Sequence, residues 1–302
     1  MSNSTKWFLR IFIVLMLFGL GIGLLMYSAF RSTGEGTREV VTLGHGDKLA
    51  VIELTGVIQS SDDIVRQIKK YRDDNSIKGI LLRVDSPGGA VVPSQEMYEE
   101  VRKTREKKPV VVSMGSLAAS GGYYVAVGGS KLVANRGTLT GSIGVIGEFW
   151  QLHEGMKKLG VDLKTIKSGK LKDAGTFSRP MSPDAEKYFQ SLMDDVHRQF
   201  VAVVEAERKL DHAAVLDLAD GRVFTGEQAV KLHLVDTLGT FEDAVTIAAE
   251  LSKIEGEPAL VRERQRKGWF ERMFGEVGES VQDLKQSLFQ IPVLSYRFTG
   301  PY

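Results

Sequence analysis

The residues around Ser120 have the types and spacing of a serine nucleophile. Ser120 lies among small residues in the segment 115–125, directly after an apolar run at 109–114 that is typical of a strand. At such a strand-to-helix turn a serine hydroxyl is presented to substrate, and small neighbours let a carbonyl approach the next backbone N–H. A hydrolase is the leading hypothesis. The structural alternative is a small-residue helix that packs against a sheet.

A second glycine-rich turn lies upstream of Ser120. A buried strand at 80–84 leads into Asp-Ser-Pro-Gly-Gly at 85–89. Pro87 fixes φ and the two glycines permit positive φ, so backbone N–H groups can turn outward into an anion-binding concavity. This turn could supply half of an oxyanion hole, although by itself it could also be a plain turn.

A serine nucleophile needs a general base, which is usually histidine. None of the five histidines follows a glycine-rich strand end, so we expect surface or packing roles and keep only His45 as an alternative base; the others are His153, His197, His212 and His233. Lysine can replace histidine when burial lowers its pKa from about 10.4. Three lysines, Lys167, Lys170 and Lys172, follow a strand-like run at 161–166. A solvated basic loop is the structural alternative for them.

Four motifs occur in a fixed order along the chain: Asp-Ser-Pro-Gly-Gly at 85–89, Ala-Ala-Ser-Gly-Gly-Tyr-Tyr at 118–124, Leu-Thr-Gly-Ser-Ile-Gly-Val at 139–145 and Ser-Gly-Lys-Leu-Lys-Asp at 168–173. Together they resemble the short, single-domain form of signal peptide peptidase A, a family of membrane-anchored serine proteases. Residues 221–226 and 232–236 also resemble the wider Clp protease and crotonase superfamily. The resemblance implies an α/β fold of that type, with parallel strands and flanking helices.

The resemblance also implies a role for each matching residue. Ser120 matches the nucleophile, and Lys172 matches the general base, with Lys170 ranked second. Ser142 matches a serine that orients the lysine. The N–H groups of Gly89 and Gly121 match the oxyanion hole, for which Gly88 supplies the turn geometry. The family further implies a homo-oligomeric ring, with an octamer as one candidate size, in which serine and lysine come from adjacent protomers. Its substrates would be apolar peptides such as released signal peptides.

Composition narrows the function classes. The chain has 302 residues, 43% of them hydrophobic, which is enough for one core with extensions. The net charge of +1 gives no bulk attraction to nucleic acid. The absence of cysteine excludes disulfides and thiol catalysis. We expect no metal and no cofactor.

The N-terminus predicts a membrane anchor. Residues 11–30 carry no charge, and a helix of that length spans a hydrocarbon core of about 30 Å. Lys6 and Arg10 precede the span and favour a cytoplasmic N-terminus, although Arg31 and Arg38 weaken this bias. We expect a single-pass protein of the cell membrane with an extracytoplasmic catalytic domain; a cleaved signal peptide is the alternative.

The remaining patterns predict the domain organisation. We expect a cytoplasmic N-terminus and anchor at 1–30, a linker at 31–46, a protease domain at 47–257 and a C-terminal extension at 258–302. Strands at 48–54 and 110–114 alternate with helices at 62–72 and 94–107, as in an α/β fold. Ser182 and Pro183 begin a long helix that ends near Lys209.

The C-terminal extension contains two kinds of pattern. Segments 268–274 and 281–289 have helical apolar spacing, typical of packing against a neighbouring protomer or a membrane surface. Residues 291–296 are extended and apolar like a substrate, which suggests the hypothesis that they occupy an active-site groove. Two other functions stay open: a crotonase-like acyl-thioester enzyme and a catalytically silent membrane scaffold.

Overall fold

The computed structural model describes residues 7, 16, 19–21, 38–265 and 295–299. The chain divides into two units, residues 1–41 with 263–290 and residues 42–262 with 291–302, and the second unit holds every predicted site residue. The helices expected at 268–274 and 281–289 lie outside the described residues, as does most of the expected membrane span at 11–30. Within the described part of the chain, no helix is both long and apolar enough to cross a membrane.

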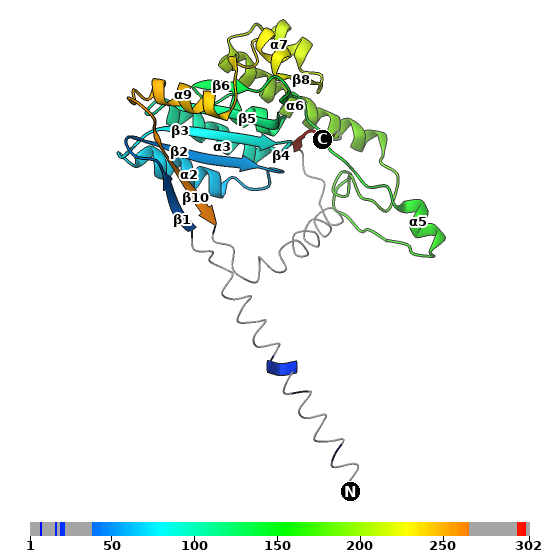
Figure 1. Cartoon of the computed structure of the whole chain (residues 1–302). Helices are drawn as coiled ribbons and strands as arrows, with labels where there is room; N and C mark the ends of the chain where they lie inside the picture. The colour runs from blue at the N-terminus through cyan, green and yellow to red at the C-terminus, as the bar shows by residue number, and fades with distance from the viewer. Residues whose placement is uncertain (1–6, 8–15, 17–18, 22–37, 266–294, 300–302) are drawn as a thin grey trace. The chain divides into compact units, whose positions relative to one another are not determined.

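The second unit is built on a mostly parallel sheet (Figure 1). Its central strands run in the order β10-β2-β3-β5-β6-β9, and every neighbouring pair in this order is parallel. They are β2 (Lys48–Thr55), β3 (Ile77–Ser86), β5 (Val110–Ala119), β6 (Lys131–Ala134), β9 (Thr237–Leu238) and β10 (Ala259–Gln265). Strand β1 (Arg38–Leu43) crosses the boundary between the units. The expected mixed α/β fold with parallel strands is confirmed.

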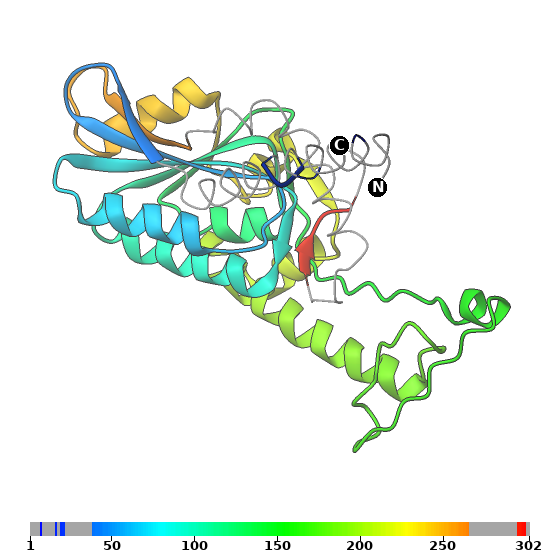
Figure 2. The same cartoon turned by 90° about the horizontal axis from the view of Figure 1, so that it is seen from below.

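Helices cover both faces of the sheet, as a parallel sheet requires. Residues that alternate along the strands form two cores: Leu81 and Val111 pack with Ala248 of α9 (Phe241–Leu251), whereas Leu82 and Val112 belong to the core on the opposite face. That opposite face is covered by α2 (Asp62–Asp73), α3 (Val91–Arg105), α4 (Gly121–Ala126) and α6 (Pro183–Arg208) (Figures 1 and 2).

Parallel pairing also puts the ends of β3 and β5 side by side, because Ser86 is in register with Ala118. Ligands of open α/β sheets bind outside the carboxyl ends of the strands. The two short strands β4 (Gly88–Ala90) and β7 (Leu139–Gly141) lie at this edge, and β7 pairs with both β5 and β8 (Val223–Thr225). The sheet therefore gathers three of the four motifs at one edge.

The segment 147–181 forms a lobe that reaches away from the sheet together with the N-terminal part of α6 (Figure 2). Phe149 packs on Phe189 of α6 with ring centroids 4.4 Å apart, and the Leu152 N–H donates to the Phe177 carbonyl. Its one helix is α5 (His153–Lys158). The strand expected at 161–166 is wrong: this segment pairs with no strand, and the Ile166 side chain is 91% exposed. The apolar residues of this segment are exposed on the surface of the lobe and do not belong to a sheet.

The long helix α6 has the predicted start. The Ser182 side chain accepts a hydrogen bond from the Ala185 N–H, and Pro183 occupies the first turn. Two further helices, α7 (His212–Leu218) and α8 (Gly226–Lys231), follow α6. Because α6 extends from the sheet into the lobe, it is the element that connects the two regions (Figure 2).

Candidate active site

Ser120 occupies the turn between β5 and α4. Its φ of 53° and ψ of −118° are unusual for a residue with a side chain, and such strain is typical of a serine nucleophile at a sharp strand-to-helix turn. The backbone fixes this turn on both sides, because the Ser120 N–H donates to the Gly141 carbonyl and the Ser120 carbonyl accepts from the Tyr124 N–H, both at 2.8 Å. The residue is buried. Among the described residues its hydroxyl has no hydrogen-bond partner.

The Pro-Gly-Gly turn lies directly beside Ser120. A Cβ atom on Gly88 would lie 2.5 Å from the Gly121 nitrogen and 3.1 Å from the Ala119 carbonyl oxygen, so only glycine allows this approach. Gly88 also has a φ of +88°, which favours glycine. The structure therefore brings together the two glycine-rich strand ends that the sequence predicts as an oxyanion hole.

Ser86 holds this turn in place, a role that the sequence alone did not reveal. Its buried hydroxyl accepts a hydrogen bond from the Gly88 N–H at 3.1 Å and donates one to the Gly56 carbonyl at 2.6 Å. The Gly88 N–H is thus occupied within the turn, which leaves the amide of Gly89 as the donor available to a substrate in the predicted oxyanion hole. Only the position of Ser86 inside the first motif could have indicated its importance.

Ser142 directly follows Gly141, whose carbonyl accepts a hydrogen bond from the Ser120 N–H. Its N–H donates to the Arg222 carbonyl at 2.9 Å, and its φ of 50° continues the tight turn that follows Gly141. Since the Gly141 carbonyl accepts from Ser120, one backbone connection joins the two serines. The structure therefore brings Ser120, Ser142 and the glycines 88, 89 and 121 together at one edge of the sheet.

Lys172 is not part of this group within the single chain. It lies in a turn of the lobe with an exposed side chain, and within the described residues it forms no ion pair. The two neighbouring lysines are paired: Lys170 contacts Asp184, and Lys167 Nζ lies 2.6 Å from Asp173 Oδ1. Of the three lysines, Lys172 is the one whose amine is not committed to a carboxylate of the described chain.

No histidine takes the place of the lysine. His45 precedes β2, at the sheet edge opposite the one that Ser120 occupies, since these strands are parallel. The ring of His197 contacts the Ala219 carbonyl, and His212 contacts Glu205. His153 starts α5 in the lobe, and His233 follows α8. The structure thus removes His45 as an alternative base.

Comparison with known proteins identifies the family. Residues 102–255 match the model of peptidase family S49. A provisionally named protease of Synechocystis is 46% identical over 69% of this chain and 76% of its own length. A provisionally named signal peptide peptidase of Enterococcus faecium is 33% identical over 85% of this chain and 79% of that protein. Protease 4 of Salmonella typhi is 36% identical over 70% of this chain but 35% of its own length.

This chain belongs to peptidase family S49. It is therefore a serine-type peptidase, and this assignment disfavours both alternatives, the acyl-thioester enzyme and the silent scaffold. The expected family resemblance is confirmed. A peptidase must hold an extended peptide with one carbonyl at its oxyanion donors. The C-terminal segment of this S49 peptidase lies beside the glycines that the sequence predicts for that role.

That segment is β11 (Ser295–Arg297), which pairs antiparallel with β4. Tyr296 is in register with Gly89, and Ser295 exchanges backbone hydrogen bonds with Ile146 on its other side. A Cβ on Gly88 would lie 2.0 Å from the Tyr296 carbonyl oxygen and 2.5 Å from the Gly121 nitrogen. The Tyr296 carbonyl oxygen and the Gly121 nitrogen therefore both lie close to Gly88, on the side where a side chain would point.

The Tyr296 side chain fills an aromatic pocket and is fully buried. Its ring stacks on Tyr124 of α4 at 5.1 Å and lies 4.8 Å from Phe200 of α6. Burial raises the pKa of Tyr124 to about 12 and raises that of Tyr296 further, so both hydroxyls stay protonated at neutral pH. The sequence motif contained Tyr124 but did not indicate this contact with residues far along the chain.

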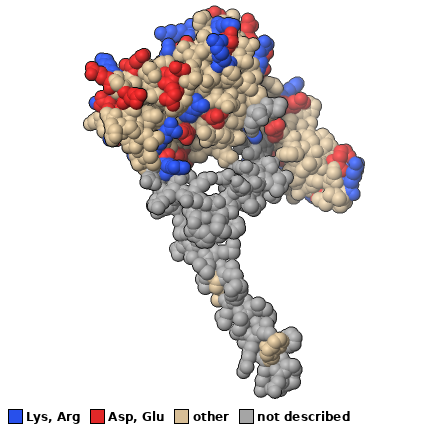
Figure 3. Space-filling view, in the orientation of Figure 1, with Lys and Arg blue, Asp and Glu red and all other residues tan. Residues whose placement is uncertain are grey.

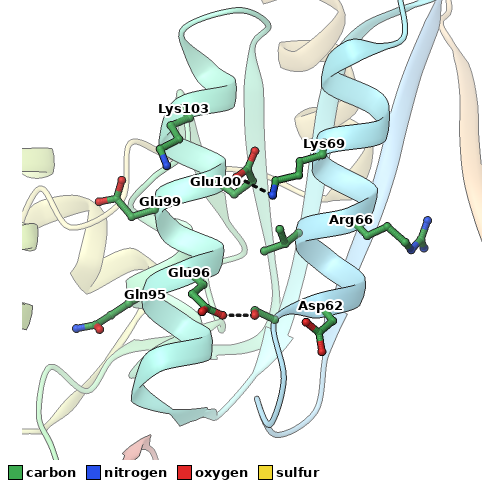
Figure 4. A pocket seen from close by; sticks show the side chains of 10 residues that line it. Asp62, Arg66, Lys69, Gln95, Glu96, Glu99, Glu100 and Lys103 are labelled. Carbon is green, nitrogen blue, oxygen red and sulfur yellow. Dashed lines mark hydrogen bonds and ion pairs between the residues drawn. The ribbon is translucent and has the colours of Figure 1, made fainter.

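A groove of about 730 Å³ between α2 and α3 is a separate feature (Figure 4). Its buried carboxylate, Glu100, contacts both Arg72 and Lys69, and the exposed Glu96 accepts a hydrogen bond from the Ser61 hydroxyl. Among the described residues no cluster of three or more histidine or carboxylate side chains could hold a metal ion.

Proposed function

We propose that this S49 peptidase is a membrane-anchored serine endopeptidase that cleaves apolar peptides, among them released signal peptides, with a Ser120–Lys172 dyad. The name of the Enterococcus faecium relative supports this substrate class. The uncharged run at 11–30 supports the anchor, with the catalytic domain outside the cytoplasm. The parallel sheet with its glycine-rich strand ends is consistent with a Clp protease or crotonase type of fold.

The proposed reaction follows from these groups. The neutral amine of Lys172 takes the proton of the Ser120 hydroxyl as its oxygen attacks a peptide carbonyl. The N–H groups of Gly89 and Gly121 donate to the oxyanion, and Ser142 orients the lysine. The lysine then gives its proton to the leaving amine. Water attacks the acyl-enzyme in the same way and restores the serine.

The position of Tyr296 is the observation that best supports the site. Its backbone adds an antiparallel strand to β4, the usual way in which a protein holds an extended peptide. Its carbonyl oxygen faces the glycines predicted to stabilise the oxyanion. This supports the hypothesis that the apolar C-terminal segment lies in the active-site groove, where it resembles a substrate.

The lobe supports the proposal that active sites are shared between copies. Its exposed apolar side chains need a cover that the described chain does not provide: Trp150, Leu159, Val161, Leu163, Ile166 and Phe177. Figure 3 shows a largely uncharged face on this lobe, in contrast to the intermixed charges of the main body. A neighbouring copy that covers the lobe could remove water from Lys172, which a lysine base requires. A ring of copies would repeat this contact at every site.

The decisive experiment compares peptide hydrolysis by the full-length protein and three variants in detergent. We expect Ser120→Ala and Lys172→Ala each to lower kcat/KM by about a thousandfold or more. The matched control Lys170→Ala removes an exposed amine two residues away and should stay within about threefold. Equal activity of the wild type and Ser120→Ala would refute the proposed nucleophile, and a larger loss in Lys170→Ala than in Lys172→Ala would reassign the base.

Mixing the two inactive variants tests whether sites are shared. If serine and lysine come from different copies, subunits of Ser120→Ala and Lys172→Ala that exchange at random should rebuild about a quarter of the sites. If both residues come from one chain, mixing should restore nothing. Full activity of a species at monomer mass would likewise contradict the shared site.

A further inference from the structure

Strand β5 is irregular just before the turn that carries the proposed nucleophile. Val84 of β3 is in register with Met114 of β5. The next pair in register is Ser86 with Ala118, so one residue of β3 lies opposite three of β5, which form a bulge at 115–117. Bulges bend a strand and are common beside active sites, where they change the direction of a side chain. The direction in which β5 delivers the nucleophile therefore depends on how this bulge is held.

Side chains on both sides of β5 bind the backbone of the bulge. The Asp85 carboxylate of β3 accepts a hydrogen bond from the Leu117 N–H at 3.1 Å. The buried Thr138 hydroxyl, from the loop between β6 and β7, donates to the Gly115 carbonyl at 2.7 Å. A bulge interrupts the ladder of a sheet, and its backbone groups need other partners. Here side chains provide two of those partners.

Asp85 also contacts the bulge directly. A Cβ atom on Gly115 would lie 2.6 Å from both the Cγ and the Oδ2 atoms of Asp85, so only glycine leaves room for the carboxylate. A glycine inside a strand often marks such a close approach. Within the described part of the chain, the Asp85 carboxylate forms no ion pair. Its contacts there are those of a hydrogen-bond acceptor that is packed against the bulge.

We propose that Asp85 is a positioning residue for the peptidase reaction: its carboxylate holds the bulge of β5 in the shape that orients the Ser120 hydroxyl toward a bound peptide. The inference rests on the proposed function, because Ser120 is taken as the nucleophile. It goes further by assigning a role to the first residue of the motif at 85–89, which no step of the proposed reaction uses. Asp85 acts through the backbone of β5.

The path from Asp85 to the nucleophile is short. Leu117, which donates to Asp85, lies three residues before Ser120. From Leu117 onward β5 pairs with β7, and the last pair in register joins Ala119 to Gly141. The Gly141 carbonyl in turn accepts from the Ser120 N–H. A change in the bulge would therefore move the pairing that fixes the serine, and a displacement of about 1 Å can cost about a hundredfold in rate.

The test compares peptide hydrolysis by the full-length protein and its variants in detergent, per mole of folded enzyme. We expect Asp85→Ala to lower kcat about thirty- to a hundredfold, with KM within about threefold. Asp85→Asn keeps an acceptor oxygen and nearly the same shape, so it should retain kcat within about threefold. The matched control is Asp236→Ala, because Asp236 likewise accepts from a strand N–H, that of Leu132 in β6, but lies outside the bulge. It should lower the thermal stability and leave kcat within about threefold.

Gly115→Ala tests the same contact without removing the carboxylate. Its Cβ would push the Asp85 side chain away from the Leu117 N–H, so kcat should fall about tenfold or more. Because both substitutions act on one contact, the loss in the double variant with Asp85→Ala should be clearly smaller than the product of the two single losses. A loss equal to that product would mean that the two residues act separately, which would overturn the inference.

Hydrogen exchange of the peptide at 114–121 separates this inference from the proposed function. Exchange should rise several-fold in Asp85→Ala and stay unchanged in Asp85→Asn. If it does so while Ser120→Ala hydrolyses peptides as well as the wild type, Asp85 holds the bulge but the proposed nucleophile is wrong. If hydrolysis depends on Ser120 but Asp85→Ala keeps its kcat, or Asp85→Asn loses as much as Asp85→Ala, the positioning role is overturned and the peptidase stands.

Discussion

The edge of the sheet around Ser120 and the lobe that carries Lys172 differ in how completely the chain itself determines them. Around Ser120, hydrogen bonds within the chain hold the two glycine-rich turns: the Ser120 N–H donates to Gly141, and the Gly88 N–H donates to Ser86. In the lobe, side chains are exposed, and α5 is its only helix. The sheet edge is complete within one chain, whereas the lobe exposes apolar side chains that the described chain does not bury.

This difference suggests a division of labour. The nucleophile and the oxyanion donors need positions accurate to a fraction of an ångström, which a close-packed sheet edge provides. The base needs a change of solvation, which assembly can provide. A peptidase arranged in this way would acquire its general base only when the copies assemble, so a single chain would not hydrolyse other proteins. The following predictions test each side of the comparison.

The largest effect is expected at the sheet edge around Ser120. Gly88→Ala should lower kcat by about a hundred- to a thousandfold, because its Cβ would occupy the space between the Gly121 nitrogen and the carbonyl of a bound peptide. Steady-state kinetics with an apolar peptide would measure this loss. Gly256→Ala is the matched control, since Gly256 also has a positive φ but no atom lies near its Cβ position.

The control should show only backbone strain, about 1 kcal/mol in the free energy of unfolding, with unchanged kcat. Comparable activities for the two alanine variants would mean that the sheet edge tolerates a side chain at Gly88. The close approach of the two glycine-rich turns would then have no catalytic importance.

A second effect is expected in the lobe. Ile166 is 91% exposed, so Ile166→Asp should change the stability of the single chain by less than about 0.5 kcal/mol. If a neighbouring copy covers the lobe, the buried carboxylate should weaken assembly and lower activity by about tenfold or more. Mass photometry and peptide hydrolysis on the same sample would measure both.

Leu216→Asp provides the control for that experiment, because Leu216 is an exposed apolar residue on α7, outside the lobe. It should alter neither assembly nor activity. An Ile166→Asp protein with normal mass and normal activity would show that the lobe is not an interface, and the source of the base would have to be sought within one chain.

The same comparison explains what the sequence could predict. Ser120 and the turn at 85–89 depend on local rules, since strand ends, glycines and a proline determine them over a few residues. The start of α6 at Ser182 and Pro183 is local for the same reason. The strand-to-helix turn at Ser120, the glycine-rich turn and the helix start were predicted correctly in position, because little else in the fold can override them.

The features that the sequence did not reveal depend on distant contacts. Tyr124, Phe200 and Tyr296 form one pocket although they are far apart along the chain, and no local pattern indicates that they meet. The strand expected at 161–166 failed because apolar spacing predicts burial without saying what provides it. In the lobe, the described chain provides no partner strand.

The smallest effect concerns how acid affects the two regions. In the lobe, a hydrogen bond from Lys167 and the nearby charge of Arg179 hold the pKa of Asp173 below its usual value of 3.8. Beside Ser142, hydrogen bonds from Arg222 lower the pKa of Asp220 to about 2. A carboxylate with a lowered pKa stabilises its surroundings above its usual pKa, and this contribution is lost as the pH falls through the lowered value.

Both carboxylates are therefore fully effective at neutral pH, and each begins to lose its contribution as the pH falls below 3.8. As the pH is lowered from 5 to below 3, we expect protection against hydrogen exchange to fall a few-fold, after correction for intrinsic rates, both in the lobe and in the loop at 220–222. Asp173→Asn should remove this pH dependence from the lobe alone, and Asp220→Asn from the loop alone. If either variant changed both regions, acid would be acting on the whole fold, and the independence of the lobe from the sheet edge would be refuted.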